Sequence, residues 1–341
     1  MTKTVPVDQA VGMVLPHDIT EIRKGEFKGR AFKKGHIIRA EDIEHLKRLG
    51  KEQIYVLELA PDDIHENEAA ELLAGALGGP GTRCTGEPVE GKLNLVADRT
   101  GLLQVDVPLL HRFNMLGEVM CATLHTNTLV HEEEQVAATR LIPLVAKRRM
   151  VDQATAIAAS NGGIIRVLPL RAARAGLVIT GNEVFHGRIK DAFEPVLRKK
   201  LTEIGSQVTT VRFAPDEVTA IAAAIRACLD DGADLIVTSG GMSVDPDDVT
   251  RQGIAAAGAT EMIYGTPVLP GAMFMVARLG TVPVLGLPAC GMFHRITVFD
   301  LILPRILAGE TIGREDLAAM GHGGLCRQCK TCVYPICGFG K

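Results

Sequence analysis

The chain has 341 residues, of which 47% are apolar and 23% charged, and its formal net charge is −3. This length predicts two or three domains with ample core, and the composition is typical of a soluble globular protein. The near-neutral charge argues against nucleic acid as a partner, and the absence of Trp with only 4% aromatic residues disfavours a base-stacking site.

The sequence also predicts the compartment. No apolar run reaches membrane-spanning length, and the N-terminal Met1–Pro6 lacks the apolar segment of a signal peptide. We therefore predict a cytoplasmic protein with no membrane partner. Eight Cys in a cytoplasmic chain indicate reduced thiols or metal ligands rather than disulfides.

Residues 1–60 predict a small N-terminal α/β domain. Phe32–Ile38 is typical of a turn that enters a strand, and 54–57 of a second strand. An amphipathic helix is predicted over 41–49, where Ile43, Leu46 and Leu49 share one face.

Residues 61–171 predict a mixed α+β or β-barrel-like domain, because short strand and helix patterns alternate there without a regular order. The predicted helices cover 66–77, 106–115 and 147–160, and the predicted strands cover 92–97, 102–107, 118–129, 136–145 and 164–168.

Residues 172–310 alternate strand and helix regularly, which predicts a doubly wound α/β sheet. The predicted strands are 176–180, 207–213, 235–238, 261–264 and 282–287, and the predicted helices are 191–204, 216–230, 248–257 and 292–307. In such sheets the ligand lies beyond the carboxyl ends of the strands. We therefore expect the loops 181–191, 239–248 and 288–291 to converge.

The loop after Leu235–Val237 carries the strongest motif. Two glycines follow in Thr238-Ser-Gly-Gly241, and three acids surround Pro246 before a predicted helix. A strand, a glycine loop and a helix N-terminus together hold phosphate or another oxyanion, and nearby acids attract a divalent cation. A tight turn without a ligand is the alternative, since the loop matches neither a Walker motif nor G-x-G-x-x-G.

Residues 311–341 form a Cys-rich tail. Its thiols follow the pattern Cys-x2-Cys-x2-Cys-x4-Cys at Cys326, Cys329, Cys332 and Cys337. Four thiolates within twelve residues suffice for one zinc ion or one iron–sulfur cluster, and reduced free thiols are the alternative.

Four segments resemble motifs of one family. Ile179–Val184 is similar to its Thr-Gly-Asp-Glu strand end, Ile189–Asp191 to its Ile/Val-Arg-Asp, Thr238–Val244 to its Thr-Ser-Gly-Gly-Val-Ser-Val, and Leu287-Pro288 to the start of its Leu-Pro-Gly-Asn-Pro loop. The family is the molybdopterin-binding domain of the molybdopterin adenylyltransferases and the molybdopterin molybdenumtransferases, whose animal member is gephyrin. Ala10–Leu15 and the strands before residue 145 resemble the transferase branch.

This resemblance implies an activity. Transferases of this family take adenylylated molybdopterin and molybdate, use Mg²⁺, leave molybdenum on the dithiolene and release AMP. The resemblance implies catalytic or metal-handling roles for Glu183, Asp191 and Asp248, of which Asp248 is also an expected metal ligand. The residues expected to contact molybdopterin are Thr180, Gly181, Ser239, Gly240, Gly241, Ser243, Pro288 and Cys290.

The chain also departs from the family pattern. Val268–Met273 replaces Lys-Pro-Gly-Lys-Pro, so both lysines are missing, and Cys290 replaces the Asn of the Leu-Pro-Gly-Asn-Pro loop. The loss of two cations from a phosphate site weakens anion binding or catalysis. The departures therefore affect the prediction of molybdenum insertion more than that of pterin binding.

Three functions are consistent with these motifs. The first is a molybdenumtransferase-like enzyme, and the second is a non-catalytic carrier or sensor of molybdopterin or its nucleotide that docks on a molybdoenzyme. The third is a nucleotide pyrophosphatase that hydrolyses ADP-ribose or a similar dinucleotide. Because the family is usually dimeric or trimeric through this domain, the resemblance also implies a homo-oligomer.

Overall fold

The computed structural model describes residues 2–23, 27–243, 245–246 and 248–341. It divides into two compact units, one made of Met1–Leu124 with Val130–Val167 and the other of His125–Leu129 with Leu168–Lys341. The four-domain division with boundaries near 60, 171 and 310 stays a prediction. None of the described helices combines the length and the apolar character needed to cross a membrane.

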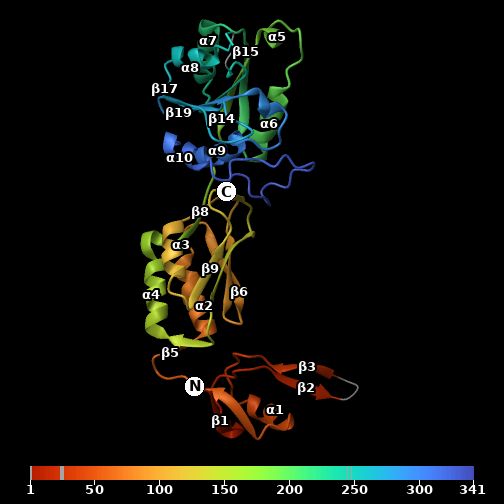
Figure 1. The fold of residues 1–341 in the computed structure, drawn as a ribbon, viewed down its shortest axis with the longest axis vertical. Helices are drawn as coiled ribbons and strands as arrows, with labels where there is room; N and C mark the ends of the chain where they lie inside the picture. The colour runs from red at the N-terminus through yellow and green to blue at the C-terminus, as the bar shows by residue number, and fades with distance from the viewer. Residues whose placement is uncertain (1, 24–26, 244, 247) are drawn as a thin grey trace. The chain divides into compact units, whose positions relative to one another are not determined.

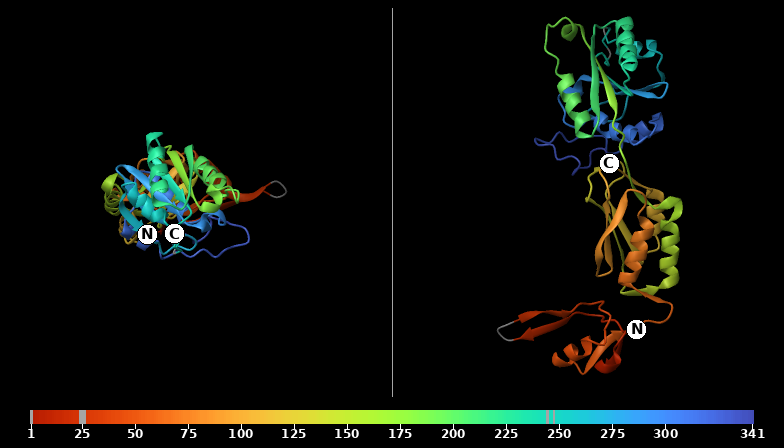
Figure 2. Two further views of the ribbon diagram at one scale, coloured as in Figure 1. Left: turned by 90° about the horizontal axis from the view of Figure 1, so that it is seen from above. Right: turned by 180° about the vertical axis from the view of Figure 1, so that it is seen from behind.

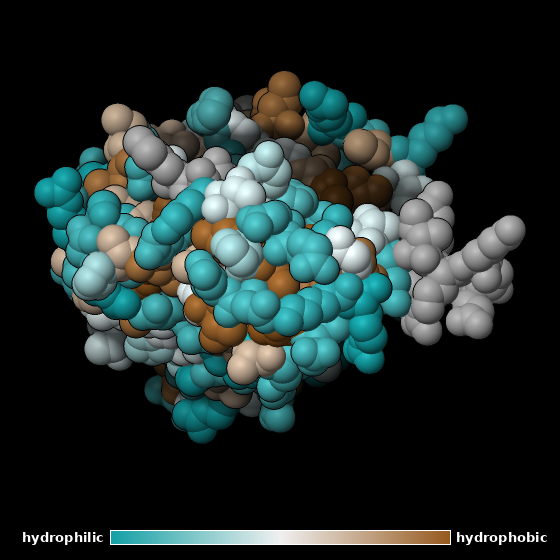
Figure 3. Space-filling view, turned by 90° about the horizontal axis from the view of Figure 1, so that it is seen from below, coloured by the Kyte–Doolittle hydropathy of each residue, from teal (hydrophilic) through white to brown (hydrophobic). Residues whose placement is uncertain are grey.

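The first unit begins with short strands and an α-helix (Figure 1), whose buried apolar side chains form a small core. Its elements are β1 (Thr2–Pro6), η1 (Val7–Gln9), β2 (Ile19–Arg23), β3 (Phe27–Phe32), α1 (Asp42–Arg48) and β4 (Gln53–Leu57). β1 pairs with β4 and β2 with β3, all antiparallel. The turn predicted within 32–38 is confirmed at Lys34 and Gly35, where the His36 N–H donates to the carbonyl of Lys33 at 3.1 Å. The strand that it was expected to enter is only an isolated bridge from Ile37 to Val14. On the face seen in Figure 3, hydrophilic residues predominate and hydrophobic ones form separate patches.

The rest of the first unit packs helices on a four-stranded sheet of order β6-β7-β11-β9. The elements are β5 (Asp63–His65), α2 (Glu66–Leu77), β6 (Thr82–Val89), β7 (Lys92–Ala97), β8 (Gly101–Val105), α3 (Val107–Asn114), β9 (Val119–Thr123), β10 (Leu129–Val130), β11 (Gln135–Leu141), β12 (Val145–Lys147), α4 (Arg148–Ala158), η2 (Ser160–Gly162) and β13 (Ile165–Leu168). The predicted strands over 118–129 and 136–145 are too long, because a loop interrupts each of them.

The second unit is built on a six-stranded sheet of order β15-β14-β16-β19-β18-β17. Its elements are β14 (Arg174–Thr180), α5 (Asn182–Phe185), α6 (Phe193–Glu203), β15 (Gln207–Ala214), α7 (Val218–Asp230), β16 (Leu235–Ser239), α8 (Thr250–Ala256), β17 (Thr260–Tyr264), β18 (Met275–Leu279), β19 (Val282–Leu287), η3 (Ala289–Met292), α9 (Val298–Leu307) and α10 (Arg314–Ala319). The strands β15, β14, β16 and β19 are parallel, and β18 and β17 continue the sheet antiparallel. The predicted α/β fold is confirmed.

Helices cover both faces of this sheet, with α7 and α8 on one face and α6 and α9 on the other (Figures 1 and 2). Successive side chains of a strand point to opposite faces. Accordingly, Leu177 and Ile179 of β14 pack in the core that contains α6 and α9, and Val178 packs in the core that contains α7 and α8. This two-sided burial explains why the parallel strands are apolar throughout.

Two helix predictions in this unit need correction. The helix predicted over 292–307 begins only at Val298, because Thr297 and Asp300 form a capping box that fixes the start there. Residues 289–292 form a separate short turn of 3₁₀-helix. The helix predicted over 248–257 covers only Thr250–Ala256.

Candidate functional site

Three parallel strands end side by side in the second unit. Ile179 of β14 is the register partner of Ser239 in β16, and Ser239 is the partner of Leu287 in β19. The loops that follow these strands therefore start at the same edge of the sheet, where doubly wound folds bind their ligands.

The loop after β16 requires its two glycines. Gly240 has a φ of +85°, and a Cβ there would lie 2.5 Å from the carbonyl oxygen of Thr180. Gly241 has a φ of +55°, and a Cβ there would overlap Oγ1 of Thr250. Both φ values are in the left-handed region that favours glycine. The close approach is fixed because the Thr180 hydroxyl donates to the carbonyl of Ser239 at 2.9 Å.

The other end of this loop is also held in place. The Met242 side chain is buried in the core beside Gly286, and the Tyr264 hydroxyl donates to the carbonyl of Met242 at 2.6 Å. The Arg251 guanidinium carbon lies 4.2 Å from the centre of the Tyr264 ring, which restrains that ring in turn. The conformation of Gly240–Met242 is therefore set by contacts within the protein, as preorganised binding requires.

A cavity of about 710 Å³ opens beside this loop. The loops that follow β16 and β19 both line it, whereas loop 181–191 does not. Further wall residues come from 269–273 and from the tail. The lining residues are Gly240, Gly241, Met242, Ser243, Asp245, Asp248, Leu269, Pro270, Gly271, Ala272, Met273, Pro288, Ala289, Cys290, Leu325 and Gln328.

The polar groups of the cavity are backbone donors and carboxylates. Among the described residues, the N–H groups of Gly240, Gly241 and Ser243 meet no acceptor within the protein. Asp245 and Asp248 are the charged side chains of the described lining, and no basic side chain accompanies them. The Asp248 N–H donates to the Asp245 carbonyl at 2.9 Å, and the Asp245 N–H donates to Oδ2 of Asp248 at 3.2 Å.

Some predicted site residues lie beside the cavity rather than in its wall. The Thr180 hydroxyl lies 2.9 Å from that of Thr250, and both hydroxyls lie next to the glycine loop. Ser239 is fully buried, and within the described part of the chain its hydroxyl oxygen has no hydrogen-bond partner. Gly181 follows β14 with a φ of +139°. Val244 and Asp247, which belong to the predicted motif, lie outside the described residues.

The three acids predicted to act together are not assembled into one group. Both carboxylate oxygens of Asp191 accept N–H bonds from the first turn of α6, from Phe193 at 2.9 Å and from Glu194 at 2.8 Å. Glu183 lies in α5, and its carbonyl oxygen accepts N–H bonds from the loop that follows. Over the residues that the structure describes, no three His, Cys, Asp or Glu side chains are placed to hold a metal ion.

Cys290 lines the cavity as predicted, and it is half-buried. Burial raises the pKa of its thiol, which a backbone N–H only partly offsets. The thiol is therefore less acidic than an ordinary cysteine thiol. Leu269, Leu325 and Gln328 were missed as cavity residues, because no local motif marks them and the tail was interpreted as a separate domain.

A family model described as "Probable molybdopterin binding domain" matches residues 176–308, and one described as a domain of unknown function matches residues 4–58. A CinA-like protein of Mycobacterium avium (strain 104) is 38% identical over 96 residues, which are 28% of this chain and 22% of that protein. The chain thus spans well under a third of the length of the curated relatives it matches.

Two solved structures are also similar. The protein CinA of Thermoplasma acidophilum, whose function is described as unknown, is 21% identical with a TM-score of 0.33, over 35% of this chain and 90% of that one. The molybdopterin biosynthesis enzyme MoaB of Thermus thermophilus is 22% identical with a TM-score of 0.35, over 40% of this chain and 98% of that one.

The strand order and the glycine loop define an α/β domain with a cavity at the carboxyl edge of its sheet, and we name this cavity of about 710 Å³ the ligand cavity. The match over 176–308 identifies this part of the chain as a divergent molybdopterin-binding domain, which is also similar to CinA-like proteins. The predicted family is therefore confirmed for this part of the chain.

Proposed function

We propose that the cavity beside Gly240–Ser243 binds molybdopterin, either free or adenylylated, with its phosphate on the N–H groups of that loop. The observation that supports this most directly is that the N–H groups of Gly240, Gly241 and Ser243 meet no acceptor among the described residues, while contacts within the protein hold Gly240–Met242 in place. Successive backbone N–H groups form a concavity that suits an anion. The cavity volume of about 710 Å³ also lies within the usual range for small-molecule sites, ~300–1,000 Å³.

We propose Mg²⁺ as the companion cation of this ligand. Mg²⁺ is usually held by one or two carboxylates together with substrate phosphates, so a cage of three protein ligands is not needed. Asp248 and Asp245, which line the cavity, supply these carboxylates. Mg²⁺ bound there would neutralise phosphate charge and polarise a phosphoanhydride.

The enzymatic form of this proposal is transfer of molybdate onto the dithiolene with release of AMP. A specific observation favours the non-catalytic alternative, a carrier or sensor that docks on a molybdoenzyme. Leu269 and Ala272 line the cavity at the positions where the resembled motif has lysines. Without these cations, the chain retains groups for binding a phosphate but fewer groups to stabilise charge that develops during transfer.

Titration calorimetry with molybdopterin and with AMP, in the presence of Mg²⁺, tests the binding step. We expect Asp248→Ala to weaken pterin binding at least about tenfold, the effect of one lost charge-assisted contact. Glu203→Ala, which removes an exposed acid of α6 outside the cavity, should leave binding unchanged. Absence of binding to either ligand would contradict the proposal.

A second assay separates the functions that share this site. AMP release from adenylylated molybdopterin that requires molybdate would identify the transferase, and tight binding without AMP release would identify the carrier or sensor. Hydrolysis of ADP-ribose without molybdate would instead identify the nucleotide pyrophosphatase. The homo-oligomer and the cytoplasmic location stay predictions.

A further inference from the structure

The Cys-rich tail is attached directly to the ligand cavity. The Leu269 N–H donates to the carbonyl of Gly324 at 2.7 Å, and the Cys326 N–H donates to the carbonyl of Leu269 at 2.9 Å. Leu269 belongs to the cavity wall, and so do Leu325 and Gln328 of the tail. The first two cysteines of the tail therefore flank residues that shape the ligand cavity.

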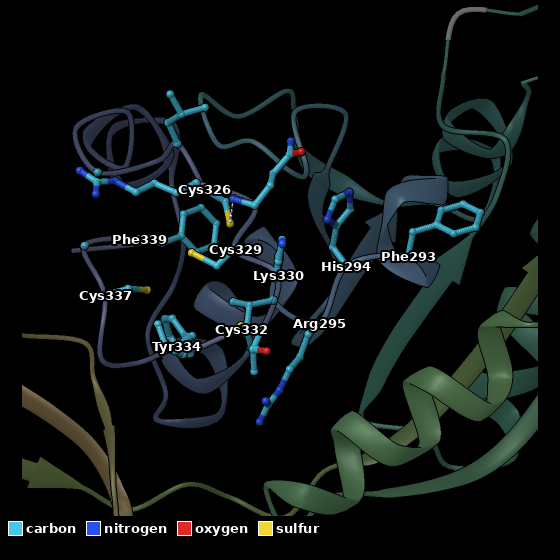
Figure 4. Close-up of a pocket in the computed structure, with 18 of the residues that line it drawn as sticks. Phe293, His294, Arg295, Cys326, Cys329, Lys330, Cys332, Tyr334, Cys337 and Phe339 are labelled. Atoms are coloured by element: carbon cyan, nitrogen blue, oxygen red, sulfur yellow. Dashed lines mark hydrogen bonds between the residues drawn. The ribbon is translucent and has the colours of Figure 1, made fainter.

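All four tail cysteines line a second cavity of about 660 Å³ (Figure 4). This cavity shares Leu325 and Gln328 with the ligand cavity. Its wall is anchored, since Phe339 is buried and Cys326, Tyr334 and Cys337 pack against the core that contains α6 and α9. The Gly340 N–H also donates to the carbonyl of Gly323 at 2.9 Å and ties the two ends of the tail together. Tertiary contacts as well as sequence thus bring Cys326 and Cys337 to this cavity.

The turn between the first two cysteines is shaped around sulfur. The N–H of Gln328 donates to Sγ of Cys326 at 3.4 Å. Gln328 has a φ of +52°, a conformation that residues other than glycine seldom adopt. An N–H directed at sulfur stabilises the negative charge of a thiolate, and such bonds recur around metal-bound Cys. The backbone strain at Gln328 is therefore consistent with a metal-binding turn.

The charges around this cavity also suit a group of thiolates. Arg295, Arg327 and Lys330 line it, and no carboxylate is among its described lining residues (Figure 4). Four thiolates around one divalent zinc ion, or around an iron–sulfur cluster, leave a net negative charge. Arg295, Arg327 and Lys330 are exposed, so they offset that charge through an attraction that salt screens rather than as tight ion pairs.

We propose that Cys326, Cys329, Cys332 and Cys337 form one four-thiolate metal centre, and that filling it fixes Leu325 and Gln328 as a wall of the ligand cavity. Without metal, no three of the described thiols are already placed as a metal site, so binding must draw them together. Metal binding and local folding are coupled in this way in many small metal sites, and each thiol releases its proton to solvent as its sulfur binds. The metal centre stands apart from the proposed function, whereas its effect on the ligand cavity rests on that function.

Metal content tests the centre itself. The full chain is purified without oxygen, and zinc, iron and labile sulfide are measured per chain, both as isolated and after reconstitution with each metal. We expect about one zinc ion, or iron with matching sulfide and a visible absorbance band, per chain. Cys329→Ser, which changes an exposed thiol, should lower the content at least about tenfold. The matched control is Cys84→Ser, an exposed thiol on β6 of the other unit, which should retain the metal.

Two results would overturn the centre. One is a metal content below roughly a tenth per chain after both reconstitutions, whether the thiols are free or joined as disulfides. The other is an equal metal content in Cys329→Ser and the wild type. Zinc and an iron–sulfur cluster would both support the centre, and the absorbance and sulfide content distinguish them.

Calorimetry with molybdopterin tests the effect on the ligand cavity, in excess Mg²⁺ and without a chelator. We expect metal-loaded wild type and Cys84→Ser to bind alike, and Cys329→Ser to bind at least about fivefold more weakly, about 1 kcal/mol. Equal binding by all three would refute the coupling while leaving the metal centre intact. Absence of pterin binding in metal-loaded wild type would instead refute the proposed function.

Discussion

Substitution of Gly240 tests whether its close approach to Thr180 shapes the loop after β16. In Gly240→Ala the new Cβ would lie 2.5 Å from the carbonyl oxygen of Thr180, whereas ordinary contact begins at 3.4 Å. One of the two must move by about 1 Å, a displacement that counts as overpacking. Thr180 does not move easily, because its hydroxyl donates to the carbonyl of Ser239 and the residue is paired in the sheet.

The expected cost has two parts. A left-handed φ costs a residue other than glycine about 1–2 kcal/mol, and overpacking adds about 1–3 kcal/mol. Gly280→Ala is the matched control, since Gly280 has a φ of +59° but nothing within 4 Å of its Cβ position. We expect Gly280→Ala to lower the free energy of unfolding by about 1 kcal/mol and Gly240→Ala by about 3 kcal/mol, with loss of ligand binding only in Gly240→Ala.

Native-state hydrogen exchange, read by mass spectrometry on peptides from β16 and β19, is the suitable assay. It measures the opening free energy of this domain without assuming that a chain of several domains unfolds in two states. Calorimetry on the same variants reports pterin affinity. Equal destabilisation by the two substitutions, with unchanged affinity in Gly240→Ala, would show that the close approach to Thr180 does not shape the site.

Other predictions concern single residues. Asp191→Ala should cost the domain about 1 kcal/mol and Asp191→Ser almost nothing, because serine also caps a helix. Loss of AMP release in the stable Asp191→Ser variant would show that Asp191 has a catalytic role after all. Ala272→Lys should tighten AMP binding without Mg²⁺ about tenfold, and an equal gain in Ala272→Met would refute the charge argument. Since burial raises the pKa of Cys290, its alkylation should still accelerate above pH 9.0, and a rate that levels off below about pH 8 would contradict this. For Asp316, burial raises the pKa but a backbone N–H and Arg305 outweigh it, so the pKa is lowered. The stability it adds above the ordinary pKa of 3.8 is lost as pH falls, so melting should separate Asp316→Asn from wild type at about pH 7 but not at about pH 2.

The parts of the fold that could be predicted are those whose sequence pattern is local. The helix Glu66–Leu77 has its predicted bounds, because its apolar face is continuous and Gly78 follows it. The strand Met275–Leu279 was missed, since it pairs antiparallel and lies outside the strand–helix alternation that revealed its neighbours. The start of α9 was predicted too early. The apolar pattern from Met292 to Ile296 resembles a helix, but the capping box at Thr297 makes the helix begin at Val298.

The site residues, too, could be predicted only where a local sequence pattern fixes their position. Gly240, Gly241 and Ser243 could be placed at the cavity from the motif alone, because the glycines fix the loop on its own strand. Asp191 could not be excluded from the cavity, since its use in capping α6 depends on the direction in which the helix leaves the loop. The contribution of Gln328 could not be foreseen, because it requires the tail to return to a loop far earlier in the chain.

The two cavities are unbalanced in charge in opposite senses. The ligand cavity carries two carboxylates and no described basic side chain, so a phosphate needs either the loop N–H groups or a divalent cation to bind there. The Cys cavity carries three basic side chains and no described carboxylate. Most of these charged side chains are exposed, so they act by raising the local concentration of ions of the opposite sign, and each cavity attracts the ion that it lacks. A divalent cation with a phosphate in the first and a negative thiolate centre in the second would satisfy both, and the wall of Leu325 and Gln328 that they share links the two occupancies.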